Sequence, residues 1–318
     1  MCSSKVTFIC TSAEASVSPL LQIVLIFVLG TLCQIAAWRV SLPSILLLLI
    51  AGLACGPVLE LLKPDQVFGL TLNPLIELAV AVILFEGGLS LRKAEMGKVG
   101  FIVLRLISAA AIATWILLGI ASYALLNINF QTASLLGAIL VVSGPTVVLP
   151  LLRIIRAKSP LEQILRWEGI LIDPIGVILA VLIADACELG LGYSAPGHVF
   201  FGILVGLGVG LFLGWLGAAV LAWTVGRHTV PDHFVVPLTL TVLFSLVIAS
   251  YLLHEQSGLL TATVMGLTVA RYHQAWVQTI EGFIGHTQRM FIGVLFIILA
   301  ARLDIDYLAH LDLNLCFF

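Results

Sequence analysis

Two carboxylates, Glu168 and Asp173, stand in the stretch Trp167-Glu168-Gly169-Ile170-Leu171-Ile172-Asp173-Pro174-Ile175-Gly176, within an apolar run of about residues 164–187. Charged side chains inside membrane spans are rare and by default mark ion or substrate pathways. Burial disfavours the charged form of a carboxyl group. We therefore expect Asp173 to hold either a proton or a cation but not both, which is sufficient for exchange of one for the other.

A second chemical feature, Ser143-Gly144-Pro145-Thr146, interrupts the apolar run of about residues 132–152. Pro145 removes a backbone donor and clashes with the preceding turn, and Gly144 loosens the helix. We therefore predict a broken helix. Carbonyl groups freed at membrane depth must face protein or a water-filled cavity, and secondary transporters bind cations with such carbonyls. Ser143 and Thr146 would add hydroxyl oxygens.

The two features are predicted to lie at one depth in the membrane. Asp173 comes about nine residues, roughly 13 Å, into its run, and the break comes roughly 17–21 Å into a run that crosses in the opposite direction. In a hydrocarbon core about 30 Å thick, both lie near the midplane. We predict a site for a monovalent cation, Na⁺ or K⁺, formed by Asp173, Thr146 and Ser143 and shaped by the Gly144-Pro145 break. Glu168, about 7 Å nearer the cytoplasm, is predicted to be a supporting or gating residue.

The composition indicates an all-α, polytopic membrane protein. Of its 318 residues, 61% are hydrophobic and 10% are charged, against about 25% charged in a soluble domain. Several apolar runs exceed the roughly 18 residues that mark a membrane span. A polar segment (1–18) is expected before a transmembrane domain (19–303), and a tail (304–318) after it. The ten predicted spans are about 19–37, 42–62, 74–90, 100–126, 132–152, 164–187, 197–224, 235–253, 257–271 and 285–303.

Basic residues predict the orientation in the cell membrane, because short loops rich in Lys and Arg face the cytoplasm. Loops 92–98, 153–166 and 227–233 carry most of them, whereas loops 127–131 and 188–196 have none. We therefore expect the first three loops in the cytoplasm and the N-terminus outside.

Several function classes receive no support from the sequence. The six cysteines form no C-x-x-C pair, the seven histidines form no H-x-x-x-H pair, and no H-E-x-x-H or Ser/His/Asp arrangement appears. No basic patch with interleaved aromatic residues suggests a nucleic-acid partner. We expect a transporter rather than an enzyme, without a cofactor, whose partners are a cation, protons and the lipid bilayer.

The stretch Glu168–Gly176, preceded by Val141–Arg153, resembles the NhaP-like branch of the monovalent cation:proton antiporters. Leu84–Arg92 and Leu295–Asp304 are similar to other blocks of that group. The resemblance extends over nearly the whole chain, from the first span to the tenth, and these four ordered blocks carry it. The resemblance implies a sodium/proton-antiporter fold with inverted repeats, a core domain, a dimerisation domain, twelve or thirteen spans and a homodimer. It also implies exchange that is typically electroneutral.

By the same resemblance, Asp173 is the ion-binding aspartate, Glu168 its accompanying glutamate, and Thr146 the threonine of the unwound helix. The chain departs from the family at Ile172, where an asparagine is frequent, and this leaves the cation preference open. Related chains also continue beyond the block around Arg302 into further spans, including a second broken helix whose arginine pairs with the glutamate. We therefore expect an incomplete copy that exchanges ions poorly or not at all.

Simpler interpretations remain open for each polar residue. Asp173 could be a buried acid that serves packing, and the 143–146 break could be a proline kink. Glu86 could be an interfacial acid, and Arg105 can extend to the membrane surface. The other isolated polar residues are Asp185, predicted at a helix end, Arg302 and Asp304, predicted to pair, and His254 and Glu255, which receive no role. As a whole, the chain could alternatively be a cation channel or uniporter, or a membrane subunit or remnant that transports nothing.

Overall fold

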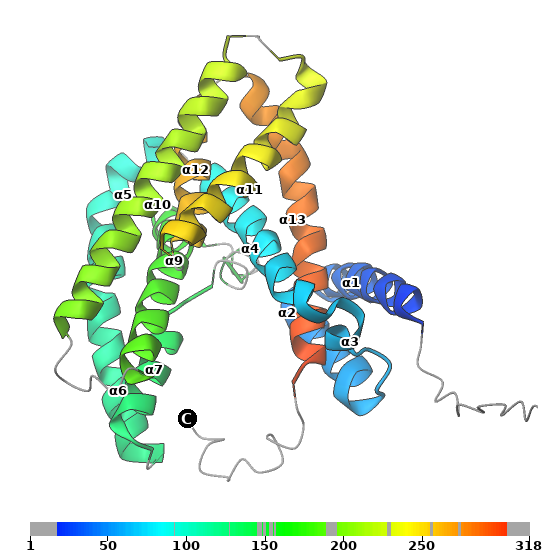
Figure 1. Cartoon of the computed structure of the whole chain (residues 1–318), viewed down its shortest axis with the longest axis vertical. Helices are drawn as coiled ribbons and strands as arrows, with labels where there is room; N and C mark the ends of the chain where they lie inside the picture. The colour runs from blue at the N-terminus through cyan, green and yellow to red at the C-terminus, as the bar shows by residue number, and fades with distance from the viewer. Residues whose placement is uncertain are drawn as a thin grey trace, which may run out of the picture.

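The structure is a computed structural model in which every regular element is a helix over the residues it describes (Figure 1). These are residues 18–303 without 92, 127, 145–147, 149–150, 153–154, 156, 189–195, 228–229, 255–256 and 273–274. The α-helices are α1 Pro19–Val40, α2 Ser44–Leu53, α3 Pro64–Phe68, α4 Leu72–Leu89, α5 Lys93–Arg105, α6 Ala111–Leu126, α7 Phe130–Leu140, α9 Leu161–Glu188, α10 Pro196–Thr224, α11 Val235–Leu253, α12 Gly258–Val269 and α13 Ala275–Ala301. A π-helical segment, Ala54–Val58, follows α2, and a second, Leu106–Ala110, joins α5 to α6.

Within the described residues, seven helical stretches are long and apolar enough to cross a membrane. They are Pro19–Val40, Pro64–Leu89, Val99–Leu126, Leu161–Ala184, Leu204–Thr224, Val235–Leu253 and Trp276–Ala301. Three shorter apolar helices, Ser44–Val58, Phe130–Leu140 and Gly258–Val269, coincide with the other three predicted spans. A helix needs about 20 residues to cross the hydrocarbon core. The chain is therefore an all-helical, multi-pass membrane protein, and the count of ten spans stays a prediction.

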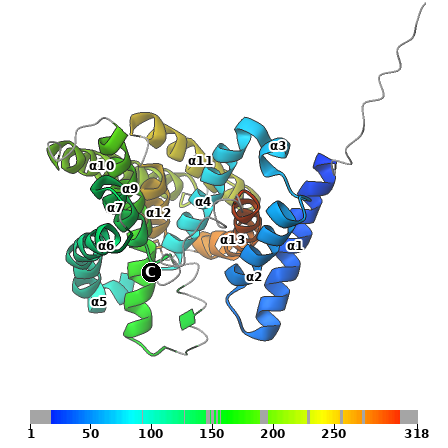
Figure 2. The same cartoon turned by 90° about the horizontal axis from the view of Figure 1, so that it is seen from below.

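Three helices lie in the middle of the bundle. In Figure 2, α5, α6, α7, α9 and α10 lie to one side, α1 and α2 lie to the other, and α4, α12 and α13 lie between them. The α4 and α12 backbones cross in direct contact, because Gly88 lies against the Thr263 carbonyl and Gly266 against the Phe85 carbonyl. A methyl group at either glycine would collide with backbone atoms.

Helix α9 carries both predicted site carboxylates and is held on two sides. Near its start, Trp167 and Ile170 are buried against Leu91, Val99 and Val103 from the α4–α5 region. Further along, Ile178 and Leu182 of α9 pack on α12. The helix continues through Pro174 without interruption.

Helix α7 ends close to the position where the sequence suggests a break. Helix α7 begins after Asn129, whose side chain accepts a hydrogen bond from the Thr132 amide at 2.7 Å, and it ends at Leu140. The backbone at 142–144 is not helical. Pro145 and Thr146 lie outside the described residues, so the predicted course of the broken helix beyond Gly144 stays a prediction.

Candidate functional site

Glu168 is bound by a residue of the segment that follows α7. The Ser143 hydroxyl donates to the Glu168 carboxylate, with Oγ lying 2.9 Å from Oε1 and 3.1 Å from Oε2. Hydrogen bonds to charged groups are stronger than those between neutral groups. The contact therefore fixes the end of α7 to the first half of α9.

Asp173 has a different environment on the same helix. Its Oδ1 atom is buried and has no hydrogen-bond partner among the described residues. Five residues separate it from Glu168, which corresponds to about 7.5 Å along the helix and about 140° around it. A buried acceptor without a partner is costly, and such a carboxylate oxygen is suited to receive a cation or a proton.

The segment after α7 also touches α9 on the other side of Asp173. A methyl group added to Gly176 would collide with the Val142 side chain, so Val142 lies directly against the turn that follows Asp173. The neighbouring Ser143 contacts Glu168, in the turn that precedes Asp173. The non-helical segment therefore runs beside α9 at the level of Asp173.

The predicted site residues are brought together in part. Ser143, Glu168 and Asp173 lie along one contact between the segment after α7 and α9. The Gly144 carbonyl is not free, because it accepts a hydrogen bond from the Val148 amide at 3.2 Å. Pro145 and Thr146, predicted to shape the site and to bind the ion, lie outside the described residues.

The hydrogen bond from Ser143 to Glu168 is a contact that sequence reasoning did not predict. We expected an arginine beside Glu168. Within the described residues, Arg166 instead pairs with Glu162. Arg302 pairs with Asp65 at 3.0 Å, while its predicted partner Asp304 lies outside the described residues.

A polar cavity of about 530 Å³ lies between α1, α4, α9 and α13. It extends to Ile170, which lies between the two acids on α9. Its charged and titratable side chains are Glu86, Glu281, His286 and Arg289. The sequence analysis singled out none of the last three. Glu281 lay before the predicted final span, which was expected to begin near residue 285, whereas α13 begins at Ala275. One signal for these residues was present in the sequence: positions 281, 285–286 and 289 are about one helical turn apart, so they share one face of a helix.

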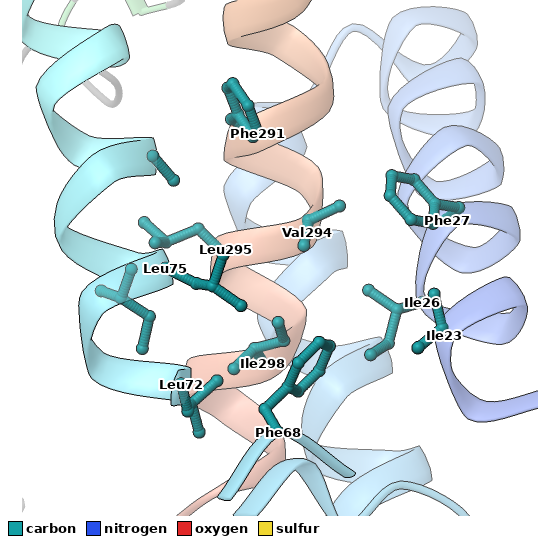
Figure 3. A pocket seen from close by; sticks show the side chains of 12 residues that line it. Ile23, Ile26, Phe27, Phe68, Leu72, Leu75, Phe291, Val294, Leu295 and Ile298 are labelled. Atoms are coloured by element: carbon teal, nitrogen blue, oxygen red, sulfur yellow. The ribbon is translucent and has the colours of Figure 1, made fainter. Parts of the chain in front are cut away.

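A second cavity, of about 190 Å³, lies between α1, α4 and α13 (Figure 3). Its lining is wholly hydrocarbon, with Phe27, Phe68 and Phe291 among the larger side chains. It offers no oxygen ligand to an ion. Among the described residues no three His, Cys, Asp or Glu side chains gather as a metal site.

Comparison with known families adds an independent observation. The family described as "Sodium/hydrogen exchanger, transmembrane" matches residues 23–318. The chain belongs to this sodium/hydrogen exchanger family. The match confirms the predicted resemblance to the monovalent cation:proton antiporters and assigns the chain to a family of transporters rather than enzymes.

Individual members of the sodium/hydrogen exchanger family are distant in sequence. A protein named "Probable Na(+)/H(+) antiporter 2" of Methanocaldococcus jannaschii is 22% identical over 300 residues, which cover 89% of this chain and 69% of that protein. "Na(+)/H(+) antiporter 1" of the same organism is 27% identical over 156 residues, covering 48% of this chain and 36% of its own length.

Solved structures of one relative share the fold. The sodium proton antiporter MjNhaP1 of Methanocaldococcus jannaschii at pH 8 superposes with a TM-score of 0.79 at 23% identity, covering 92% of this chain and 72% of that chain. An electron-microscopy structure of the same antiporter superposes with a TM-score of 0.70 at 22% identity, and the match covers 88% of this chain and 68% of that chain. These superpositions confirm that the chain has the fold of a sodium/proton antiporter, as the sequence predicted.

Proposed function

We propose that this sodium/hydrogen exchanger family member exchanges a monovalent cation, Na⁺ or K⁺, for protons at a site centred on Asp173. The observation that carries the proposal is the buried Oδ1 of Asp173, which has no partner among the described residues and lies beside the non-helical segment that follows α7. Polar groups at membrane depth are expensive and mark ion pathways.

The exchange follows from competition at one carboxyl group. Protonated Asp173 releases its proton to one side of the membrane, and the resulting carboxylate binds the cation. Before the site can take up a proton again, the cation has to leave. Because a proton and a cation cannot occupy Asp173 together, each cycle moves one against the other.

Ser143 and Glu168 support the site from the cytoplasmic side of Asp173 in this proposal. The hydrogen bond between them holds the segment after α7 against α9, so that the Ser143 hydroxyl oxygen lies near the cation's path. We expect Thr146 to supply a further oxygen and the Gly144-Pro145 pair to keep the segment from becoming helical. The polar cavity that extends to Ile170 provides a water-accessible route toward Asp173.

The proposal includes a cell-membrane location with the N-terminus outside and loops 92–98, 153–166 and 227–233 in the cytoplasm. The basic residues of these loops support this orientation. We also propose that the protein acts as a homodimer, which rests on the resemblance to NhaP-like antiporters. Cysteine labelling of the loops in sealed vesicles tests the orientation, and mass measurement in detergent tests the assembly.

Vesicles that contain the purified chain test the exchange. Proton movement opposed to a Na⁺ or K⁺ gradient, followed with a pH-sensitive dye and abolished by Asp173→Asn, would support the site and overturn the expectation that the chain exchanges ions poorly or not at all. Glu162→Gln is the matched control, because it removes a carboxylate from the same helix in its first turn and should leave exchange intact. Cation flux without opposed proton flux would instead indicate a channel or uniporter.

A binding measurement keeps the site testable if the chain moves no ions. Titration calorimetry with NaCl and KCl should show heat of binding that falls as the pH is lowered and that is absent in Asp173→Asn. Equal cation binding by wild type and Asp173→Asn would disprove the site. No binding by either protein would favour a membrane remnant without transport.

A further inference from the structure

Arg105 is a permanent cation on the most exposed membrane helix of the molecule. Only 6% of the apolar window in Val99–Leu126 is buried inside the protein, against 22–50% in the other six candidate spans. Arg105 is exposed, as are its neighbours Phe101 and Leu104. Its charge therefore faces the membrane rather than the protein interior.

The guanidinium group has a defined position on this surface. Its Cζ atom lies 5.0 Å from the centre of the Phe101 ring, four residues earlier on α5. The side chain therefore extends toward the beginning of the helix. Phe101 follows Val99, the first residue of the apolar stretch, by two residues, or roughly 3 Å along the axis. This places the charge at the level of lipid headgroups rather than in the hydrocarbon core.

No acid of the described residues neutralises Arg105. The three ion pairs among them involve Lys63, Arg166 and Arg302. The one contact described for the guanidinium is the Phe101 ring, and no hydrogen bond from it to a described residue accompanies this contact. A planar guanidinium binds phosphate with two parallel hydrogen bonds and stacks on aromatic rings at the same time.

The backbone beyond Arg105 gives the surface a particular shape. The π-helical segment Leu106–Ala110 begins at the next residue, and such turns are frequent at functional sites. The Ser108 hydroxyl turns inward to donate to the Leu104 carbonyl at 2.5 Å. Ser108 and Ala109, the exposed residues one turn further along, are both small. They leave a shallow apolar surface beside the charge.

We propose that Arg105 and Phe101 form a binding site for the headgroup phosphate of an anionic phospholipid. The charge is complementary, the ring fixes the guanidinium at headgroup level, and the shallow surface beside it can accept the beginning of an acyl chain. Arg227 lies over the Trp223 ring at 5.7 Å, so the α10 end carries the same pairing of an arginine with an aromatic residue four positions earlier. The proposal is independent of ion exchange at Asp173.

Native mass spectrometry of the full chain, released from mixed phosphatidylglycerol and phosphatidylcholine micelles, tests this site. Wild type should retain phosphatidylglycerol in preference to phosphatidylcholine, and Arg105→Gln should lower that retention about fivefold. Arg105→Lys keeps the charge but loses the planar donor pair, so it should give an intermediate value. The matched control is Arg39→Gln, which removes an exposed arginine at the end of α1 that has no aromatic residue four positions earlier.

Each outcome decides between sources of the binding. An equal loss in Arg39→Gln would show general charge attraction and would overturn the site, as would unchanged retention in Arg105→Gln. Displacement of the lipid by millimolar inorganic phosphate would show a free-phosphate site instead. Masses of protein dimers that disappear in Arg105→Gln would show that a second copy covers this surface. Size-exclusion profiles that match wild type exclude misfolding as the cause.

Discussion

Glu168 and Asp173 occupy one helix in two contrasting regions. Around Glu168, a hydroxyl group from a neighbouring segment meets both carboxylate oxygens. Around Asp173, one oxygen is buried without a partner among the described residues. Both are carboxyl groups of one helix, about 7.5 Å apart along it, and they differ in what the segment at 142–144 offers to each. A carboxylate with a partner contributes to structure, whereas one without a partner is available for a ligand.

The largest expected effect is that substitution of one acid changes mainly the exchange activity, whereas substitution of the other changes mainly the stability. Asp173→Asn should abolish exchange while leaving the thermal unfolding temperature unchanged or raised, because it removes the charge of a carboxyl group whose buried Oδ1 has no partner among the described residues. Glu168→Gln should lower the unfolding temperature and leave part of the exchange. Thermal unfolding in detergent and dye-reported exchange measure the two quantities, and the reverse pattern would contradict the assignment of roles.

The next effect concerns the contact between Val142 and α9. Gly176→Ala places a methyl group against the Val142 side chain. Overpacking of this kind costs about 1–3 kcal/mol, so we expect lower stability and a raised KM for the cation. Gly208→Ala is the control, because a methyl group there meets no atom within 4 Å. If both variants behave alike, the segment after α7 does not set the geometry around Asp173.

A smaller effect is expected for the hydrogen bond itself. Ser143→Ala leaves the half-buried Glu168 carboxylate without its described partner, at a cost of about 0.5–1.5 kcal/mol in the free energy of unfolding. Combined with Glu168→Gln in a double-mutant cycle, it should show a coupling energy above about 0.5 kcal/mol. Ser143→Ala combined with Asp173→Asn should be additive. Strong coupling in that second cycle would instead place Ser143 directly on Asp173.

The smallest effect is expected at Glu60, an exposed carboxylate with a partner that serves as a reference for the two acids of α9. Lys63 donates a hydrogen bond to Glu60 at 2.9 Å, and this contact lowers the pKa of Glu60 below its ordinary value. A lowered pKa in the folded state adds stability above the ordinary pKa of glutamate, and the gain is lost as the pH falls through the folded-state value. Lys63→Gln should therefore lower the unfolding temperature slightly at pH 7, with a difference that vanishes in acid. A difference that persists in acid would assign the effect to packing.

The fold was predictable where apolar runs are long. Seven of the ten predicted spans correspond to helices long enough to cross a membrane, since their composition leaves few alternatives to a helix in lipid. Helix ends were less predictable. The predicted last span began near residue 285 and left out Glu281, although α13 starts at Ala275, because this acid lines a cavity inside the protein rather than facing lipid.

The candidate site was predictable in its parts but not in its contacts. The cost of a carboxylate at membrane depth singled out Asp173 and Glu168, and helix-breaking residues singled out Ser143–Thr146. Asp173 and the 143–146 break were also predicted to lie at the same depth in the membrane, and therefore the two segments were expected to meet. The choice of Ser143 as the partner of Glu168, rather than an arginine, depends on side-chain directions that only the packed structure provides.

The contact between Gly88 and Gly266 has a mechanical consequence. At this crossing no side chain separates the α4 and α12 backbones, so no change of rotamer there can let one helix slide past the other. We therefore expect the pair to move together. A change in the width of the polar cavity would then come from displacement of α1, α9 or α13 relative to that pair.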